Sequence, residues 1–327
     1  TDASALSVTA TSDNNATASS VVISIGLFAG GGANAVAEVT ENADTDAIIG
    51  SGSLITIPGH SVTVSAMSGN DAIAQSATAA GGAVAVSVSS PSANVFGDTS
   101  AQLLGSVGSA TPGEDSDGNA TMIGIAGASS VSVTATATDR SKATIKSFGA
   151  GLVAASASTA TSRTNSTTEA KFGAGNITAS GNVTLLADSN TDSDAFADSV
   201  GGGAIQVAGF TSNATSDSTV RATTGAGLIQ AGNDISIRAV HDGSQVLANA
   251  TGGGGGAVSV NFGNAAATSN PTVQTLVDAN ILRARDVTIE SESIARARAQ
   301  STHQGAGAVA IGNTDANVFS NNHVLTE

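Results

Sequence analysis

A repeat of 52 residues constrains the fold of this chain more than any other feature of its sequence. A motif of the form apolar-x-apolar-x-small begins at Val131, Val183, Ile235 and Val287, so the three intervals between successive starts are all 52 residues. Self-similarity at a fixed period of this size indicates a stacked repeat architecture, in which each unit buries the inner face of its neighbour. We therefore expect residues 1–327 to form a single repeat array.

Two earlier copies of the motif begin near Leu6 and Val62, after longer spacers. The interval from Val62 to Val131 is 69 residues, which is 17 more than the repeat, and the polar stretch Thr111–Asn119 supplies the extra length. Pro112 and three carboxylates interrupt the alternation there, so we place an insertion at about residues 105–120. The copies then begin near residues 6, 62, 131, 183, 235 and 287. The insertion is expected to protrude as a loop whose removal leaves stability nearly unchanged.

Each repeat also contains an internal echo. The sequence Phe-Gly-Ala-Gly at residues 148–151 returns at residues 172–175, a separation of 24 residues. We interpret each 52-residue unit as two coils of about 26 residues, which is an ordinary coil size for a β-helix. The chain would then hold about 12 or 13 coils and form a rod about 60 Å long, at about 4.8 Å between strands.

Alternating side chains predict β-strands and essentially no helix. Segments such as Val183–Ala187 and Ile235–Ala239 place apolar residues on one face and polar residues on the other, with a period of two. Glycine pairs lie where a coil must turn. The predicted fold class is all-β, a parallel β-helix (β-solenoid). Its inner face is expected to hold two stacked columns, formed by Val131, Val133, Val183, Leu185, Ile235, Ile237, Val287 and Ile289.

The composition argues against several classes of function. The chain has 26 acidic and 11 basic residues, for a net charge of −15, whereas nucleic-acid binding needs a basic surface. Cysteine is absent, so there is no disulfide framework and no thiolate metal site. No apolar run approaches the roughly 18 residues of a membrane span. With neither an initiator Met nor a signal peptide, the chain is expected to be a segment of a longer secreted protein, flanked by further repeats.

Two stretches of the sequence resemble the repeats of filamentous-haemagglutinin-type exoproteins, namely Gly175-Asn-Ile-Thr-Ala-Ser-Gly-Asn-Val-Thr-Leu-Leu-Ala187 and Ala226-Gly-Leu-Ile-Gln-Ala-Gly-Asn-Asp-Ile-Ser-Ile-Arg-Ala239. The segments Gly81–Val86 and Gly256–Asn261 resemble giant bacterial surface adhesins built on the same solenoid. The resemblance implies a right-handed parallel β-helix, an extracellular location, and a role as adhesin, stalk or matrix fibre. The implied partners are neighbouring repeats, a host or neighbour-cell surface, or further copies of the chain.

A polysaccharide-cleaving enzyme is an alternative, because many β-helices carry one. Such a site needs clustered acids and bases on one outer face. The available arginines are Arg221, Arg238, Arg283, Arg285, Arg296 and Arg298, but Tyr and Trp are absent, so platforms that stack on sugar rings are missing. The histidines are His60, His241, His303 and His323, which fall at different repeat offsets and are expected to be solvated. We predict a structural protein without catalysis, and a self-assembling matrix or filament subunit is the second interpretation.

One row of polar residues could hold a metal ion. Asp188, Asn190, Asp192 and Asp194 follow an Asp-x-Asn-x-Asp-x-Asp spacing. In a curved loop, alternate oxygen side chains can converge on calcium, which takes six to eight oxygen ligands. In a straight strand the same residues would point outward in a row and form a solvated acidic face. The four residues are therefore calcium candidates, with the acidic face as the competing interpretation.

Overall fold

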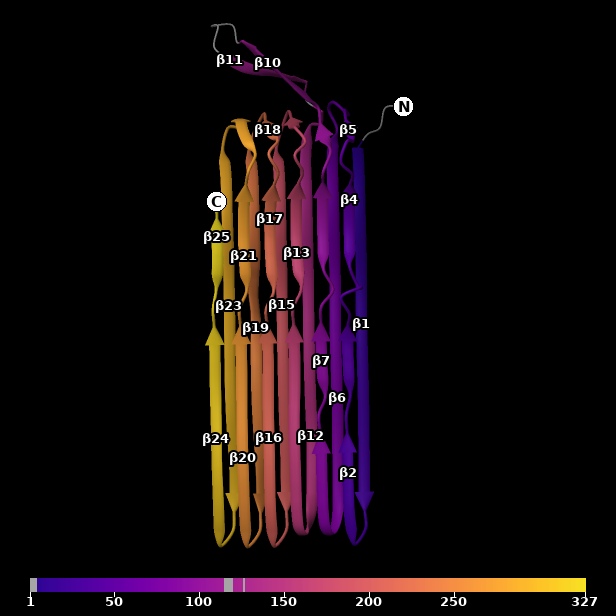
Figure 1. Ribbon diagram of the computed structural model, residues 1–327, viewed down its shortest axis with the longest axis vertical. Coiled ribbons are helices and arrows are strands. Elements are labelled where there is room, and N and C mark those ends of the chain that lie inside the picture. Colours follow the sequence, from indigo (N-terminus) through magenta and orange to yellow (C-terminus); the bar gives the residue numbers. More distant parts are fainter. Residues whose placement is uncertain (1–4, 115–119, 126) are drawn as a thin grey trace.

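The computed structural model describes the backbone of residues 5–114, 120–125 and 127–327, and the side chains of these residues outside 109–125 and 243–244. Regular structure in these residues consists of β-strands, and nearly all of the strand pairs are parallel. The prediction of an all-β fold with stacked parallel strands is thus confirmed. Figure 1 shows a flat, elongated body in which the strands run along the longest axis and the coils follow one another across the shorter one.

Each coil consists of one long strand and a segmented return path. In the fourth coil the chain runs along β15 (Val183–Gly202), turns, and comes back through β16 (Ile205–Ser216), β17 (Thr219–Thr224) and β18 (Leu228–Ala231). The equivalent long strands are β1 (Ala5–Ile25), β6 (Ser61–Ser89), β12 (Ser130–Thr164), β19 (Ile235–Gly255) and β23 (Val287–Ala306), of which β6 and β12 continue round the turn into the return path.

The return strands of the other coils align in three consecutive groups. The first group, nearest the turn, contains β2 (Phe28–Ala33), β3 (Val36–Val39), β7 (Ser92–Val95), β20 (Val258–Ser269) and β24 (Val309–Ser320). The second contains β4 (Thr45–Ile49), β8 (Thr99–Leu103), β13 (Thr167–Phe172), β21 (Thr272–Val277) and β25 (His323–Thr326). The third contains β5 (Leu54–Ile55), β9 (Ser106–Val107), β14 (Ile177–Ala179) and β22 (Asn280–Arg283).

The predicted division of each repeat into two coils is wrong. Val131 pairs with Val183, and Val183 pairs with Ile235, so a residue lies beside the residue 52 positions later and one coil uses the whole repeat. The described chain therefore forms about six wide coils in place of 12 or 13 narrow ones. At about 3.3 Å per residue a 20-residue strand is about 66 Å long, whereas six coils at about 4.8 Å stack to only about 29 Å. The long dimension runs along the strands and not along the solenoid axis.

The inner columns predicted from the alternation are present. Val183, Leu185, Ile235 and Ile237 are almost completely buried, and they pack with Val131 and Val133 in the largest apolar cluster. Val287 and Ile289 continue the same columns by pairing with Ile235 and Ile237. They stay partly exposed because β23 is the edge strand of the sheet formed by the described residues.

Small residues keep the two layers of each coil close together. A second buried cluster is mostly alanine, with Phe210 and Ile145 as its largest members. Hydroxyl groups fill the interior between the apolar clusters and bond to one another across the coil. For example, Ser141 Oγ lies 2.7 Å from Ser162 Oγ and 3.1 Å from Ser193 Oγ. These bonds satisfy polar atoms that would otherwise be costly to bury.

Glycine is required at one position of the turn that joins the long strand to the return path. A Cβ atom built on Gly203 would lie 2.0 Å from the carbonyl oxygen of Gly151 in the preceding coil. The same close approach recurs along the stack, at Gly82, Gly151, Gly256 and Gly307. The column exists because backbones of successive coils stack directly on each other at this turn, which leaves no room for a side chain.

The Gly203→Ala variant is expected to lower the free energy of unfolding by about 2 kcal/mol, because overpacking against a fixed backbone costs about 1–3 kcal/mol. The adjacent Gly202→Ala is the matched control, since a Cβ built there meets nothing within 4 Å. Urea denaturation followed by circular dichroism measures both. Equal effects of the two substitutions would contradict the stacked-turn geometry.

The extra residues between the second and third coils form an antiparallel hairpin, β10 (Ser109–Glu114) and β11 (Ala120–Ile125). The expected loop at about 105–120 is thus replaced by a hairpin over 109–125, and residues 115–119 of the Thr111–Asn119 stretch lie outside the described part. The parallel ladder is regular on both sides, because Ile55 pairs with Val107 before it and Val62 pairs with Val131 after it. Figure 1 shows β10 and β11 projecting beyond the end of the coils.

Candidate functional site

The four calcium candidates lie in one row on the outer face of β15. Asp188, Asn190, Asp192 and Asp194 alternate with the buried residues Ser189, Thr191 and Ser193. Alternate residues of a straight strand are about 6.6 Å apart, so these side chains do not converge on one point as calcium ligands must. In the parts of the chain that the structure describes, no group of three or more His, Cys, Asp or Glu residues is arranged to hold a metal ion. The geometry favours the acidic-face interpretation.

A matching basic row lies on the preceding coil. Arg140, Lys142 and Lys146 of β12 stand opposite Asp192, Asp194 and Asp198 of β15 in the parallel register. The closest approach is 4.0 Å, between Arg140 Nε and Asp192 Oδ2. Opposite charges on directly paired residues stabilise one register over its alternatives, so this charge ladder helps to fix which coil stacks on which.

The pKa values of the three aspartates in this acidic row, Asp188, Asp192 and Asp194, are all raised. Burial and the negative charge of Asp192 raise the pKa of Asp194 to about 6, against the opposing effects of Lys142 and Arg140. Burial also raises the pKa of Asp192, while Arg140 and Lys142 lower it. For Asp188, burial and the charge of Asp242 raise the pKa, and Arg238 lowers it. The largest cause of each shift is burial of the carboxyl group among its neighbours, which disfavours the charged form.

Two of the six arginines considered for glycan cleavage, Arg238 and Arg285, are held in similar pairs between coils. Arg238 Nε lies 2.8 Å from Glu290 Oε2, and Arg238 Nη2 lies 3.5 Å from Glu292. Arg285 binds both carboxylate oxygens of Asp234, at 3.0 and 2.8 Å. Each of these guanidinium groups thus faces a carboxylate on a neighbouring coil. Exposed pairs of this kind contribute about 1 kcal/mol or less to stability.

One histidine contradicts the expectation that all four are solvated. His241 is completely buried, and its Nε2 atom lies 3.1 Å from the hydroxyl oxygen of Thr191. Burial lowers the pKa of His241, because a cation is poorly solvated inside the coil. His241 lies an even number of residues after Ile235 and Ile237 in the same strand, so the alternation of side chains already places it on the inner face. The other three histidines are at least partly exposed.

The interior also holds a carboxyl group that the search for outer-face acids missed. Asp139 is 1% exposed, and it accepts hydrogen bonds from Asn70 Nδ2, at 2.7 Å, and from the Ser166 hydroxyl. Asn70 in turn accepts a bond from Asn14 Nδ2 at 2.8 Å, so a polar ladder crosses three coils. Burial raises the pKa of Asp139 to about 6, and the two hydrogen bonds partly offset this rise. This carboxyl group is enclosed and has no path to a substrate.

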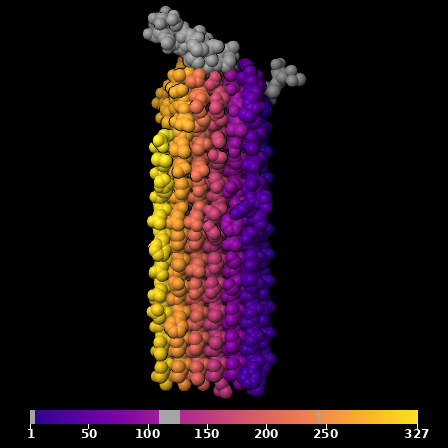
Figure 2. Space-filling model, viewed as in Figure 1, coloured from indigo at the N-terminus to yellow at the C-terminus, as the bar shows by residue number. Residues whose placement is uncertain are grey.

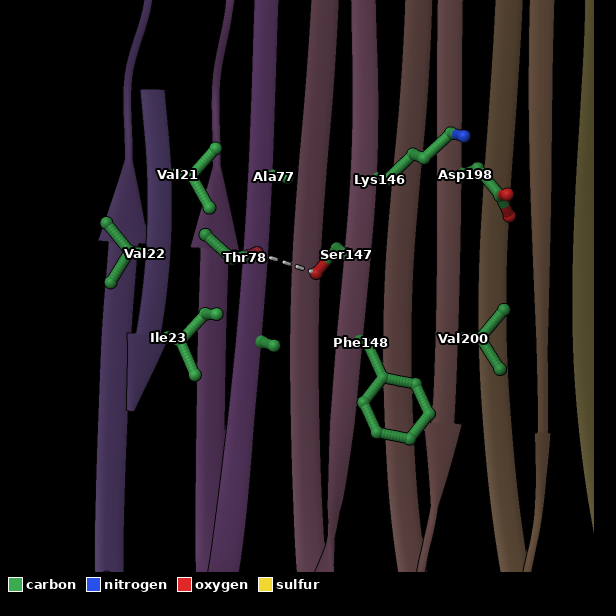
Figure 3. Close-up of a pocket in the computed structure, with 11 residues that line it drawn as sticks. Val21, Val22, Ile23, Ala77, Thr78, Lys146, Ser147, Phe148, Asp198 and Val200 are labelled. Carbon is green, nitrogen blue, oxygen red and sulfur yellow. Dashed lines mark hydrogen bonds between the residues drawn. The ribbon is translucent and has the colours of Figure 1, made fainter. Parts of the chain in front are cut away.

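A shallow groove of about 340 Å³ lies on the outer face of the long strands, close to the turn (Figure 3). Its floor is Ala77 and Ala79, and its walls are Val21 and Ile23 of the first coil and Phe148 of the third. Lys146 and Asp198 mark its more polar end. All its other outward-facing residues are apolar, so most of the groove is an apolar contact surface.

Comparison of the chain with protein-family models, with curated proteins and with solved structures finds no significant match to any of the three. The described residues contain no helix that is long and apolar enough to cross a membrane.

Proposed function

We propose that this chain is a structural segment of a large secreted bacterial adhesin or cell-surface fibre and that it has no catalytic role. The observation that carries the proposal is the parallel ladder that joins the long strands of all six coils, in which residues pair with their equivalents one coil later, with a register shift only where β19 pairs with β15 and β23. Such a chain turns length into stacked, mutually buried coils. The sequence resemblance to filamentous-haemagglutinin-type repeats and to giant surface adhesins supports the extracellular location. We further propose that the coils wind right-handed, as nearly all parallel crossovers do.

The width of the coil suggests stiffness as the mechanical property. Each coil adds only about 4.8 Å to the axis, so 52 residues provide little reach, but they join neighbouring coils through a ladder that spans a strand about 66 Å long. Tension along the axis is shared by this whole ladder, including the charge pairs between β12 and β15. A wide ribbon of this kind resists bending and rupture better than a narrow one.

Single-molecule stretching of the intact chain tests the mechanical role. Unfolding one coil should release about 180 Å of extended chain, at 3.3–3.6 Å for each of about 52 residues. We expect a force trace with repeated steps of this size. Rupture of all coils in one event at low force, or steps of about half this length, would contradict the proposed function. Antibodies against the chain should also label intact producing cells, and labelling only after permeabilisation would overturn the surface location.

A further inference from the structure

The turn end of the coils is an uncharged apolar edge. We define this apolar edge as the register-equivalent residues 23–33, 79–89, 148–158, 200–210, 253–263 and 304–314, which form the turn and its flanking strands in the six coils. These segments contain no Asp, Glu, Lys, Arg or His, although the chain as a whole carries 26 acidic and 11 basic residues. Six consecutive coils without a single charge at the same end indicate one continuous surface and not a scatter of apolar side chains.

Large side chains are exposed along this edge. Leu152, at the apex of the third coil, is 66% exposed, and Phe148 beside it is 50% exposed. Ile205 and Val207 of the fourth coil are exposed on the other side of the turn. The groove lined by Ala77 and Phe148 continues the same surface onto the face of the long strands (Figure 3). Contiguous apolar surface of this extent marks an interaction site.

The opposite end of the coils is different in charge and shape. It carries the Asp234–Arg285 pair, Asp286 and Arg283, and the hairpin formed by β10 and β11 projects from it. At the apolar edge the coil turns end at nearly the same level, so the edge is straight and flat (Figures 1 and 2). The turns of successive coils form parallel ridges along this edge, about 4.8 Å apart.

We propose that the apolar edge binds the apolar edge of a second copy of this chain, so that two ribbons join side by side. Two molecules with a net charge of −15 repel each other over most of their surface, and this edge is the end where contact brings no like charges together. Two straight edges with identical spacing also fit each other. Six coils at about 4.8 Å make the edge about 29 Å long, and two layers about 10 Å apart with their outward side chains make it about 20 Å wide. A dimer would then bury about 1,200 Å² in total, the lower end of the range for specific interfaces.

A lipid surface is the less favoured occupant. The edge has no Lys, Arg or His to contact phosphate groups, and the rest of the chain is acidic, so anionic membranes would repel it. The proposal goes beyond the structural role, because a stiff segment need not pair with another copy.

Sedimentation of the full chain over a wide range of concentration tests the proposal. We expect a monomer of 31.3 kDa in equilibrium with a dimer, and a tighter dimer at higher NaCl, because salt screens the repulsion between the acidic bodies. The double variant Leu152→Glu/Ala204→Glu should weaken the dimer at least about tenfold. The control Leu54→Glu/Leu282→Glu adds the same charge at exposed apolar positions near the opposite end and should leave it unchanged.

A crosslink gives an independent readout, because the chain has no cysteine. Two edges of six coils can overlap fully by a two-fold rotation in two ways. If the two stacks run in the same direction, the third coil faces the third coil of the second copy; if they run in opposite directions, it faces the fourth. Mild oxidation should therefore convert Leu152→Cys, but not Leu282→Cys, to a covalent dimer. A chain that stays monomeric at every concentration, a dimer that resists Leu152→Glu/Ala204→Glu, or a monomer that binds phosphatidylcholine vesicles would overturn the proposal. Open-ended oligomers insensitive to these substitutions would instead indicate pairing between the exposed strand edges of the end coils, and would also overturn it.

Discussion

The Ile237→Asp variant is expected to lose about 5 kcal/mol of stability, the largest effect of any single substitution considered for this chain. Ile237 has no solvent exposure, and it stacks between Leu185 and Ile289 in the largest apolar cluster. Removing a large aliphatic side chain from a core costs about 2–5 kcal/mol. Burying a carboxyl group without a hydrogen-bond partner adds about 1–3 kcal/mol. Native domains are stable by only about 5–15 kcal/mol, so the coils around residue 237 should open.

The neighbouring Ser236→Asp variant is the matched control. Ser236 lies on the outer face of the same strand, so the same charge one residue away should change stability by only about 0.5 kcal/mol. Urea denaturation, combined with hydrogen exchange resolved by segment, measures both variants. In Ile237→Asp we expect protection to be lost mainly in the fifth and sixth coils, because contacts in a repeat array are made with adjacent units. A larger loss in Ser236→Asp than in Ile237→Asp would show that the register is shifted by one residue.

The register of the solenoid could be predicted from the sequence because one face of each strand is apolar. A shift by one residue would expose Val183 and Leu185 and bury their polar neighbours, so alternation and the 52-residue spacing together allow one arrangement. The same reasoning identified the columns of inner residues. The charge pairs between β12 and β15 were equally accessible, because Arg140 and Asp192 are one repeat apart.

The width of the coil could not be obtained in the same way. The echo at Phe148 and Phe172 suggested two equivalent coils, yet Phe148 is 50% exposed and Phe172 only 1% exposed. The glycines that follow them belong to two different bends of the same coil, Gly149 and Gly151 at the apolar edge and Gly173 and Gly175 between β13 and β14. Glycine is favoured wherever backbones stack closely. The two Phe-Gly-Ala-Gly motifs are therefore similar because both bends bring backbones close together, and not because they occupy equivalent positions in two coils.

The length of the strands was hidden by polar residues on the inner face. Serine and threonine at positions such as Ser141 and Ser193 make the middle of each long strand polar on both faces, which is typical of a loop. The structure shows that these hydroxyls bond to one another inside the coil. The repeat spacing does not predict the partners on the facing layer of the same coil, such as Ser162 for Ser141, because only the folded coil brings the long strand and the return path together. The alternation of each strand places Asp139 and His241 on the inner face, which the sequence alone indicates. That they are buried there depends on polar partners inside the coil, which only the structure shows.

The buried carboxyl group of Asp139 gives the second large prediction, a pH-dependent cost to stability. Its pKa is about 6 in the folded chain and about 3.8 in the unfolded chain. Between these values the native state binds more protons than the unfolded state, so stability falls as the pH rises, and the loss is complete above pH 6. A difference of about two pKa units corresponds to about 3 kcal/mol. The contribution of Asp139 alone should therefore make the folded chain less stable at pH 8 than at pH 4.

The Asp139→Asn variant should remove this cost. An amide keeps an acceptor for Asn70 Nδ2, and its own N–H groups can be accepted by the Ser166 hydroxyl, which can rotate to suit. Urea denaturation across the pH range should show wild type and variant nearly equal in stability near pH 4 and the variant more stable by about 3 kcal/mol at pH 8. The Asp198→Asn control on the exposed outer face should leave the pH profile close to that of the wild type. A variant that is less stable than wild type at pH 8 would mean that the ionised carboxylate is favourable in the ladder, and that its hydrogen bonds outweigh the loss of hydration on burial.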